Sequence, residues 1–122
     1  MTQVKNTQPE SEARVTRFLE SYELYRRILG GTRRARAFFT SDEDRRSLAD
    51  DALLKTRMMT VRKFILTLPD CREKMLLYYR YLFGYSVERC AELMGVSRRT
   101  AFRIAHEAIR FAAESFDGRE TF

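Results

Sequence analysis

The sequence predicts an all-α protein with about five helices. Only five glycines and two prolines occur in 122 residues, which leaves little material for the many turns of a sheet protein. Apolar residues make up 44% of the chain, and they recur at alternating spacings of three and four, the pattern of one helix face. We therefore expect a long N-terminal helical pair followed by a C-terminal helix-turn-helix with an extended recognition helix.

The first part of the chain is predicted to hold a tail and one long helix. Residues 1–12 are polar and without pattern, which predicts a disordered tail. An apolar stripe follows, and its helix should stop at Gly30 and Gly31 because glycine commonly ends helices. The stripe consists of Val15, Phe18, Tyr22, Tyr25 and Leu29, widened by Leu19 and Ile28.

A short basic and aromatic segment, TRRARAFF, separates the first helix from the second. The segment is an ordinary interhelical loop if Phe38 and Phe39 belong to the core. If it instead reaches DNA, three of its side chains are candidates for additional DNA contacts: Arg33, Arg34 and Arg36.

Two further helices are expected before the C-terminal motif. Ser41, with an acidic residue three positions later, has the spacing of a helix start, and this second helix should run until Pro69. Asp70 and Glu73 could cap a third helix that closes at Gly84. The second helix carries the stripe Leu54, Met58, Val61, Ile65 and Leu68, and the third carries Met75, Leu76, Tyr79 and Leu82.

Residues 85–110 predict two helices joined by a tight turn. Ser86 can cap the first helix, Gly95 supplies the left-handed residue that ends it, and Ser97 can cap the second. A small Ala91 at the crossing and a glycine in the turn meet the steric requirements of a helix-turn-helix. The buried positions should be Cys90, Ala91 and Met94 on the first helix and Ala101, Ile104, Ala105 and Ala108 on the second.

This packing leaves a free face on the second helix, and the side chains on it are the candidate DNA-binding residues. Arg98 and Arg99 lie in the first turn, where a recognition helix enters the major groove, so one of them could bind a guanine bidentately. Phe102 could press on thymine methyl groups or pack against the N-terminal helices. The arginines could alternatively be solvated helix residues. The full set is Ser97, Arg98, Arg99, Phe102, Arg103, His106 and Arg110.

The positive charge of the chain is concentrated outside this motif. The formal net charge is +6, of which residues 1–67 contribute +5 and residues 68–122 only +1. Within the motif we expect local sorting of charge, with Glu88, Glu92 and Glu107 facing away from the arginines. A lone module of net charge +1 should bind DNA weakly, so the N-terminal half must add contacts, dimerise the protein or recruit RNA polymerase.

Several classes of protein are disfavoured by composition. Two cysteines and one histidine do not supply the four N or S ligands of a structural zinc site. Cys90 is expected to pack as a small buried hydrophobe. A catalytic pair of a cysteine with His106 lacks a residue to orient either partner, and the sequence contains no glycine-rich phosphate-binding loop. No apolar run approaches the ~18 residues of a membrane span, and no secretory signal opens the chain. We therefore expect a cytoplasmic protein that is not an enzyme and has no cofactor, no metal and no membrane contact.

From Leu68 to Phe111 the sequence resembles region four of bacterial sigma factors. The likeness is collinear: a Leu-Pro opening, an amphipathic helix ending in YLFGYS, the caps, the turn and a long last helix. The whole chain resembles the small phage and prophage regulators of the ArpU and RinA kind, in which a helical N-terminal segment precedes such a module. The resemblance implies promoter DNA as a partner, and contact with RNA polymerase through the neighbourhood of Met75–Tyr85.

The sequence therefore predicts a sequence-specific DNA-binding transcription regulator of phage or prophage type that acts on double-stranded DNA as a homodimer. One alternative is a protein-interaction module that docks on RNA polymerase or another factor and has little DNA affinity of its own. Another is the DNA-recognition subunit of a phage packaging enzyme. The expected organisation is a tail (1–12), a helical segment for packing or dimerisation (13–67), a DNA-binding domain (68–117) and a C-terminal tail (118–122).

Overall fold

The computed structural model describes the backbone of residues 9–35 and 41–116 and the side chains of residues 10–30 and 51–116. Within these residues the fold is all-α, as expected, with five α-helices and no strand. The elements are α1 (Pro9–Ala35), α2 (Ser41–Leu66), α3 (Arg72–Leu77), the π-helix η2 (Tyr78–Leu82), α4 (Val87–Met94) and α5 (Arg98–Phe116).

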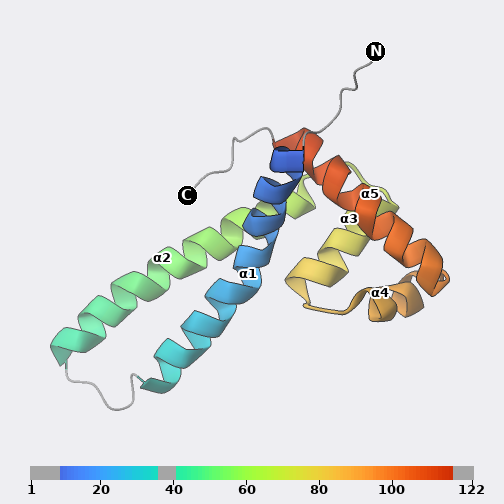
Figure 1. The fold of residues 1–122 in the computed structure, drawn as a ribbon. Helices are drawn as coiled ribbons and strands as arrows, with labels where there is room; N and C mark the ends of the chain where they lie inside the picture. The colour runs from blue at the N-terminus through green and yellow to red at the C-terminus, as the bar shows by residue number, and fades with distance from the viewer. Residues whose placement is uncertain (1–8, 36–40, 117–122) are drawn as a thin grey trace.

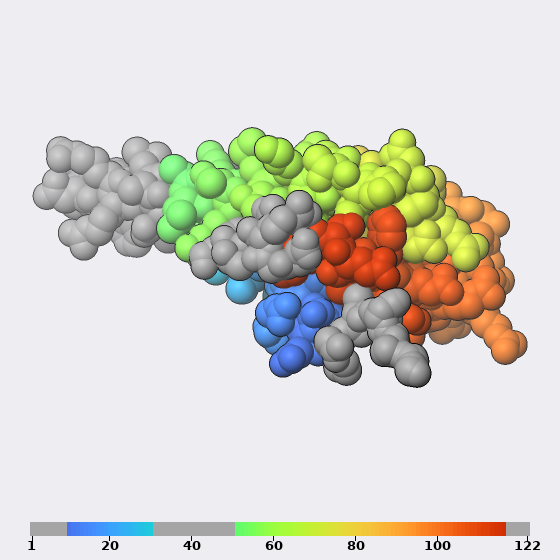
Figure 2. Space-filling view, turned by 90° about the horizontal axis from the view of Figure 1, so that it is seen from above, coloured from blue at the N-terminus to red at the C-terminus, as the bar shows by residue number. Residues whose placement is uncertain are grey.

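The two long helices form an antiparallel hairpin, and the three shorter ones gather at one end of it (Figure 1). α5 runs diagonally across this end and contacts α1, α3 and α4. The opposite end of the hairpin projects away from α3, α4 and α5. Seen from above, α2 lies along one long side of the molecule with the end of α5 against it (Figure 2).

Helix α1 is longer at both ends than the sequence predicted. Pro9–Glu12 belongs to α1 and not to the tail, because proline suits a first helical turn and Glu10 and Glu12 favour its positive end. The predicted stop at Gly30 and Gly31 is wrong, since α1 continues to Ala35. Gly30 does not adopt the positive φ that ends a helix, so it only adds the ordinary cost of an interior glycine, about 0.5–1 kcal/mol.

Side chains from both halves of the chain form one hydrophobic core. Phe18 of α1, Phe64 of α2 and Phe116 of α5 pack ring against ring, with centroid distances of 4.9–5.7 Å. The core therefore crosses the expected boundary between residues 67 and 68, and the hairpin holds the C-terminal helices in place. The other large, fully buried members are Val15, Leu19, Val61, Ile65, Leu76, Leu77, Cys90 and Ile104.

The two predicted stripes of the hairpin pack against each other within one chain, and most of their side chains are buried. Val15 and Leu19 of α1 and Val61 and Ile65 of α2 are fully buried, so these side chains of the expected segment 13–67 serve packing within the chain. Other members of the stripes are only partly buried, namely Tyr22, Tyr25, Leu54 and Met58, and Ile28 keeps 44% of its surface exposed.

The connection from α2 to α3 differs from the expected capping. Asp70 does not cap α3: its carboxylate binds the ammonium group of Lys74 at 2.8 Å, and Cys71 occupies the N-cap without a side-chain hydrogen bond. Glu73 lies in the first turn of α3, where it favours the helix dipole without acting as the cap. Lys74 also donates to the carbonyl oxygen of Leu66 at 3.0 Å, so it ties the end of α2 to α3. The hydrogen bond and charge of Lys74 lower the pKa of Asp70.

Helix α3 widens into η2, and the chain then turns at Gly84. This glycine has a φ of 75°, so the predicted end of the third helix is confirmed. No helix in the described ranges is both long and apolar enough to span a membrane.

Candidate nucleic-acid interface

Helices α4 and α5 are joined by a short turn whose capping groups are those predicted from the sequence. The side chain of Ser86 accepts from the backbone N–H of Arg89 at 3.1 Å and caps α4. Gly95 is left-handed, with a φ of 69°, and the next N–H, of Val96, bonds to the carbonyl oxygen of Ala91 at 3.0 Å. The hydroxyl of Ser97 then accepts from the N–H of Thr100 at 3.1 Å, which caps α5.

The inward side of the two helices is apolar and closely packed. Cys90 and Ala91 of α4 are buried, as are Ala101, Ile104 and Ala108 of α5, so the predicted register is confirmed. Met94 and Ala105 are partly buried at the edge of the core. The buried stripe of α5 continues beyond the predicted part, through Ala112, Ala113 and Phe116.

The outward side of α5 carries the predicted candidates, and each of them is exposed. Phe102 keeps 48% of its surface accessible, so its ring belongs to the free face and is not packed into the core with α1 and α2. From residue 98 to residue 110 the face spans about 18 Å at 1.5 Å per residue. The exposed set is Ser97, Arg98, Arg99, Phe102, Arg103, His106 and Arg110.

The acidic side chains are sorted less completely than expected. Glu88 does not face away from the arginines, because its carboxylate binds the guanidinium of Arg98 at 3.2 Å. Glu88 lies in the first turn of α4 and Arg98 opens α5, so the turn brings their side chains together although ten residues separate them. Glu92 is paired with Arg89 at 2.8 Å, and Glu107 with Arg72 of α3 at 3.6 Å.

Three arginines of the free face have no acidic partner among the residues that the structure describes: Arg99, Arg103 and Arg110. Their guanidinium groups keep all their donors for a ligand. A carboxylate, a phosphate or the acceptor edge of a guanine matches that planar donor pattern.

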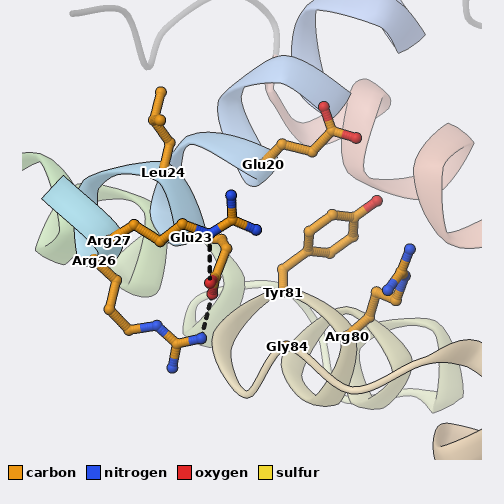
Figure 3. A pocket seen from close by; sticks show the side chains of 8 residues that line it. All are labelled: Glu20, Glu23, Leu24, Arg26, Arg27, Arg80, Tyr81 and Gly84. Atoms are coloured by element: carbon orange, nitrogen blue, oxygen red, sulfur yellow. Dashed lines mark hydrogen bonds and ion pairs between the residues drawn. The ribbon is translucent and has the colours of Figure 1, made fainter.

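A second group of arginines surrounds a pocket of about 400 Å³ between α1 and η2 (Figure 3). Arg26 and Arg27 both pair with Glu23, the latter at 3.3 Å, so part of their charge is neutralised locally. Arg80 donates to the carbonyl oxygen of Tyr85 at 3.1 Å. Sequence reasoning missed Arg80, because only the hairpin packing brings η2 next to α1.

Burial raises the pKa of the Tyr81 phenol in this pocket, with Arg80 opposing the shift.

Some of the remaining candidate residues lie outside the described residues, and the structure gives the surroundings of the others. The side chains of Arg33 and Arg34, and all of Arg36, lie outside the described residues. Cys90 is a free, buried thiol that packs as a small hydrophobe, and burial raises its pKa. In the described part of the chain, no three His, Cys, Asp or Glu side chains lie close enough to hold a metal ion.

Comparison of the chain with protein-family models, with curated proteins and with solved structures finds no match. The packing and charge of α4 and α5 are therefore the basis for assigning a function. What they offer is a capped helix held on a rigid core, with unpaired arginines on its exposed side.

Proposed function

We propose that this chain is a sequence-specific DNA-binding transcription regulator of phage or prophage type that inserts α5 into the major groove. One observation carries the proposal: Ala101, Ile104 and Ala108 are fully buried, while every candidate on the opposite side of the same helix is exposed. A helix fixed on one side and rich in arginine on the other has the shape and charge that the groove accepts.

In this proposal the residues of α5 take different roles along the helix. Arg99 and Arg103 are unpaired and lie a turn apart, so they bind base edges, and Phe102 between them contacts thymine methyl groups. The positive end of α5, beginning beside Ser97, meets a phosphate. Arg110, about 18 Å from the start of the free face, binds the backbone.

The low charge of the C-terminal part requires additional contacts. A homodimer supplies them, because two modules on paired half-sites double the contacts. Since α1 and α2 bury most of their stripes within one chain, such a dimer would use exposed side chains such as Leu24, Ile28 and Leu53. Light scattering at micromolar concentration tests this part: a mass near 14.5 kDa, that of one chain, contradicts the dimer.

Selection of bound sites from random DNA tests the proposal as a whole. The full chain is incubated with a random duplex library at about 100 mM salt, where non-specific binding is already weakened. The proposal expects a defined motif to be enriched. A library that stays random after several rounds contradicts DNA reading.

A second candidate function is docking on RNA polymerase with little DNA affinity. Met75 and Phe83 favour it, because they are 46% and 44% exposed in the segment before α4 that the sigma-factor resemblance implicates. A cavity of about 330 Å³ lined by Met75 and Tyr78 lies beside them. Enrichment of polymerase subunits on the immobilised full chain, together with an unenriched DNA library, favours this function over the first.

A further inference from the structure

The hairpin carries a groove between its two helices that the DNA-binding face does not use. Tyr22 and Leu29 come from α1, and Met58 and Met59 from α2, around a space of about 330 Å³. Met59 is the most exposed large apolar side chain of the described residues, at 67%. The remaining lining residues are two cations of α2: Lys55 and Arg62.

The outer side of α2 has a helical stripe of its own at this groove. Lys55, Met59, Arg62 and Leu66 follow one another at spacings of four, three and four, so they share one face of α2. This face differs from the buried stripe of Val61 and Ile65, and Leu66 on it is 42% exposed. Apolar and basic side chains therefore alternate along an exposed row about 16 Å long.

The charge at the groove is positive and has no acidic counterpart among the described residues of the lining. Lys55 and Arg62 form no ion pair within the described part of the chain, and no described acidic residue lines the groove. On the other side of the hairpin, Arg26 and Arg27 share Glu23. Two unpaired cations that flank the partly buried Met58 and the exposed Met59 form a surface for a ligand that is both acidic and apolar.

We propose that this groove binds an amphipathic helix of a partner protein, with acidic residues bordering an apolar row. A third helix laid along α1 and α2 covers Met58 and Met59 with its apolar side. Lys55 and Arg62 are seven residues, or about 10 Å, apart, so two acidic residues seven apart on the partner reach both. Unbranched methionine side chains adapt to the apolar row of such a helix.

Two other occupants fit the groove less well. In a two-fold contact of α2 with a second copy, Lys55 and Arg62 face like charges. A nucleic acid bound in the groove would not cover its apolar lining or the exposed Met59, because phosphate groups bind hydrogen-bond donors and not thioethers. The acidic helix alone satisfies both the charge and the apolar surface.

A pair of synthetic peptides tests the proposal on the full-length protein. Each is a labelled helix of about 18 residues with leucines on one face; one carries glutamates seven residues apart beside the leucines, and the other lysines at the same positions. Fluorescence anisotropy is expected to show binding of the glutamate peptide at least about tenfold tighter than the lysine peptide. Added salt is expected to reduce this difference.

Variants on the same helix locate the site. Lys55→Glu combined with Arg62→Glu is expected to reverse the preference between the two peptides, and Met59→Ala to weaken the glutamate peptide about threefold or more. Lys63→Glu is the matched control, because Lys63 is exposed on α2 outside the groove, and it is expected to leave the preference largely unchanged. Unchanged melting temperatures of the variants exclude misfolding.

Three outcomes overturn the inference. The first is equal binding of both peptides, or an equal effect of Lys63→Glu and the groove variants. The second is loss of DNA affinity in the Lys55→Glu and Arg62→Glu variant without peptide binding by the wild type, which makes the groove a nucleic-acid contact. The third is a halved mass of Met59→Ala in light scattering, which makes it a contact between copies of this chain. The first and the third can be observed whether or not α5 reads DNA.

Discussion

Replacement of Ile104 by alanine tests the packing that holds α5 with its free face outward. Ile104 is fully buried in α5, and the change removes its three carbon atoms beyond Cβ. Their transfer from water accounts for about 2.4 kcal/mol at 0.8 per carbon, and the residual cavity raises the loss to about 3–4 kcal/mol. For a domain of this size about 1 kcal/mol shifts Tm by about 4 °C, so a decrease of about 12–16 °C is expected.

The matched control is Phe102→Ala on the same helix. Phe102 lies on the free face, 48% exposed, so its loss should change stability by only about 0.5 kcal/mol and Tm by about 2 °C. Both melts are followed by circular dichroism at one pH and salt concentration. Equal decreases of Tm for the two variants mean that the inward and outward sides of α5 have been assigned incorrectly.

Two further predictions concern DNA binding. A plot of the logarithm of DNA affinity against the logarithm of salt concentration should have a slope of about −4 to −5 for the full chain. Replacement of Arg33, Arg34 and Arg36 by glutamine should make this slope shallower by about 2–3. An unchanged slope means that these arginines do not contact DNA. Glu88→Gln frees Arg98 from its ion pair and should increase DNA affinity about three- to tenfold in electrophoretic mobility shifts. The control is Glu92→Gln, which removes the same charge but releases only Arg89, and its effect on affinity should be much smaller. Equal effects of the two variants mean that the pair with Arg98 is irrelevant to binding.

The features that were predictable from the sequence are those set by neighbouring residues. Ser86, Gly95 and Ser97 each act within four residues, through a side-chain oxygen or a left-handed backbone, and the structure has all three as expected. The alternation of Ala101, Ile104 and Ala108 with exposed arginines follows from the 3.6-residue period alone.

The features that were missed depend on contacts between distant segments. Gly30 remains helical because α1 packs along α2. Helix propensity depends on the residue type alone and takes no account of such tertiary packing. The packing of Phe64 on Phe116 joins the end of α5 to the hairpin, 52 residues away in the chain. The ion pair between Glu88 and Arg98 forms because of the angle between α4 and α5. The positions of the capping residues in the sequence do not determine that angle.

Repeating the site selection with single alanine variants of Arg99 and Arg103 tests the central claim most directly. If these side chains read bases, each variant should still select DNA but lose preference at one position of the wild-type motif, with a loss of affinity of about 1–3 kcal/mol. Lys63→Ala is the control, since Lys63 is an exposed cation of α2 and not of α5. Variants of Arg99 and Arg103 that select the wild-type motif with wild-type affinity contradict the reading of DNA by α5.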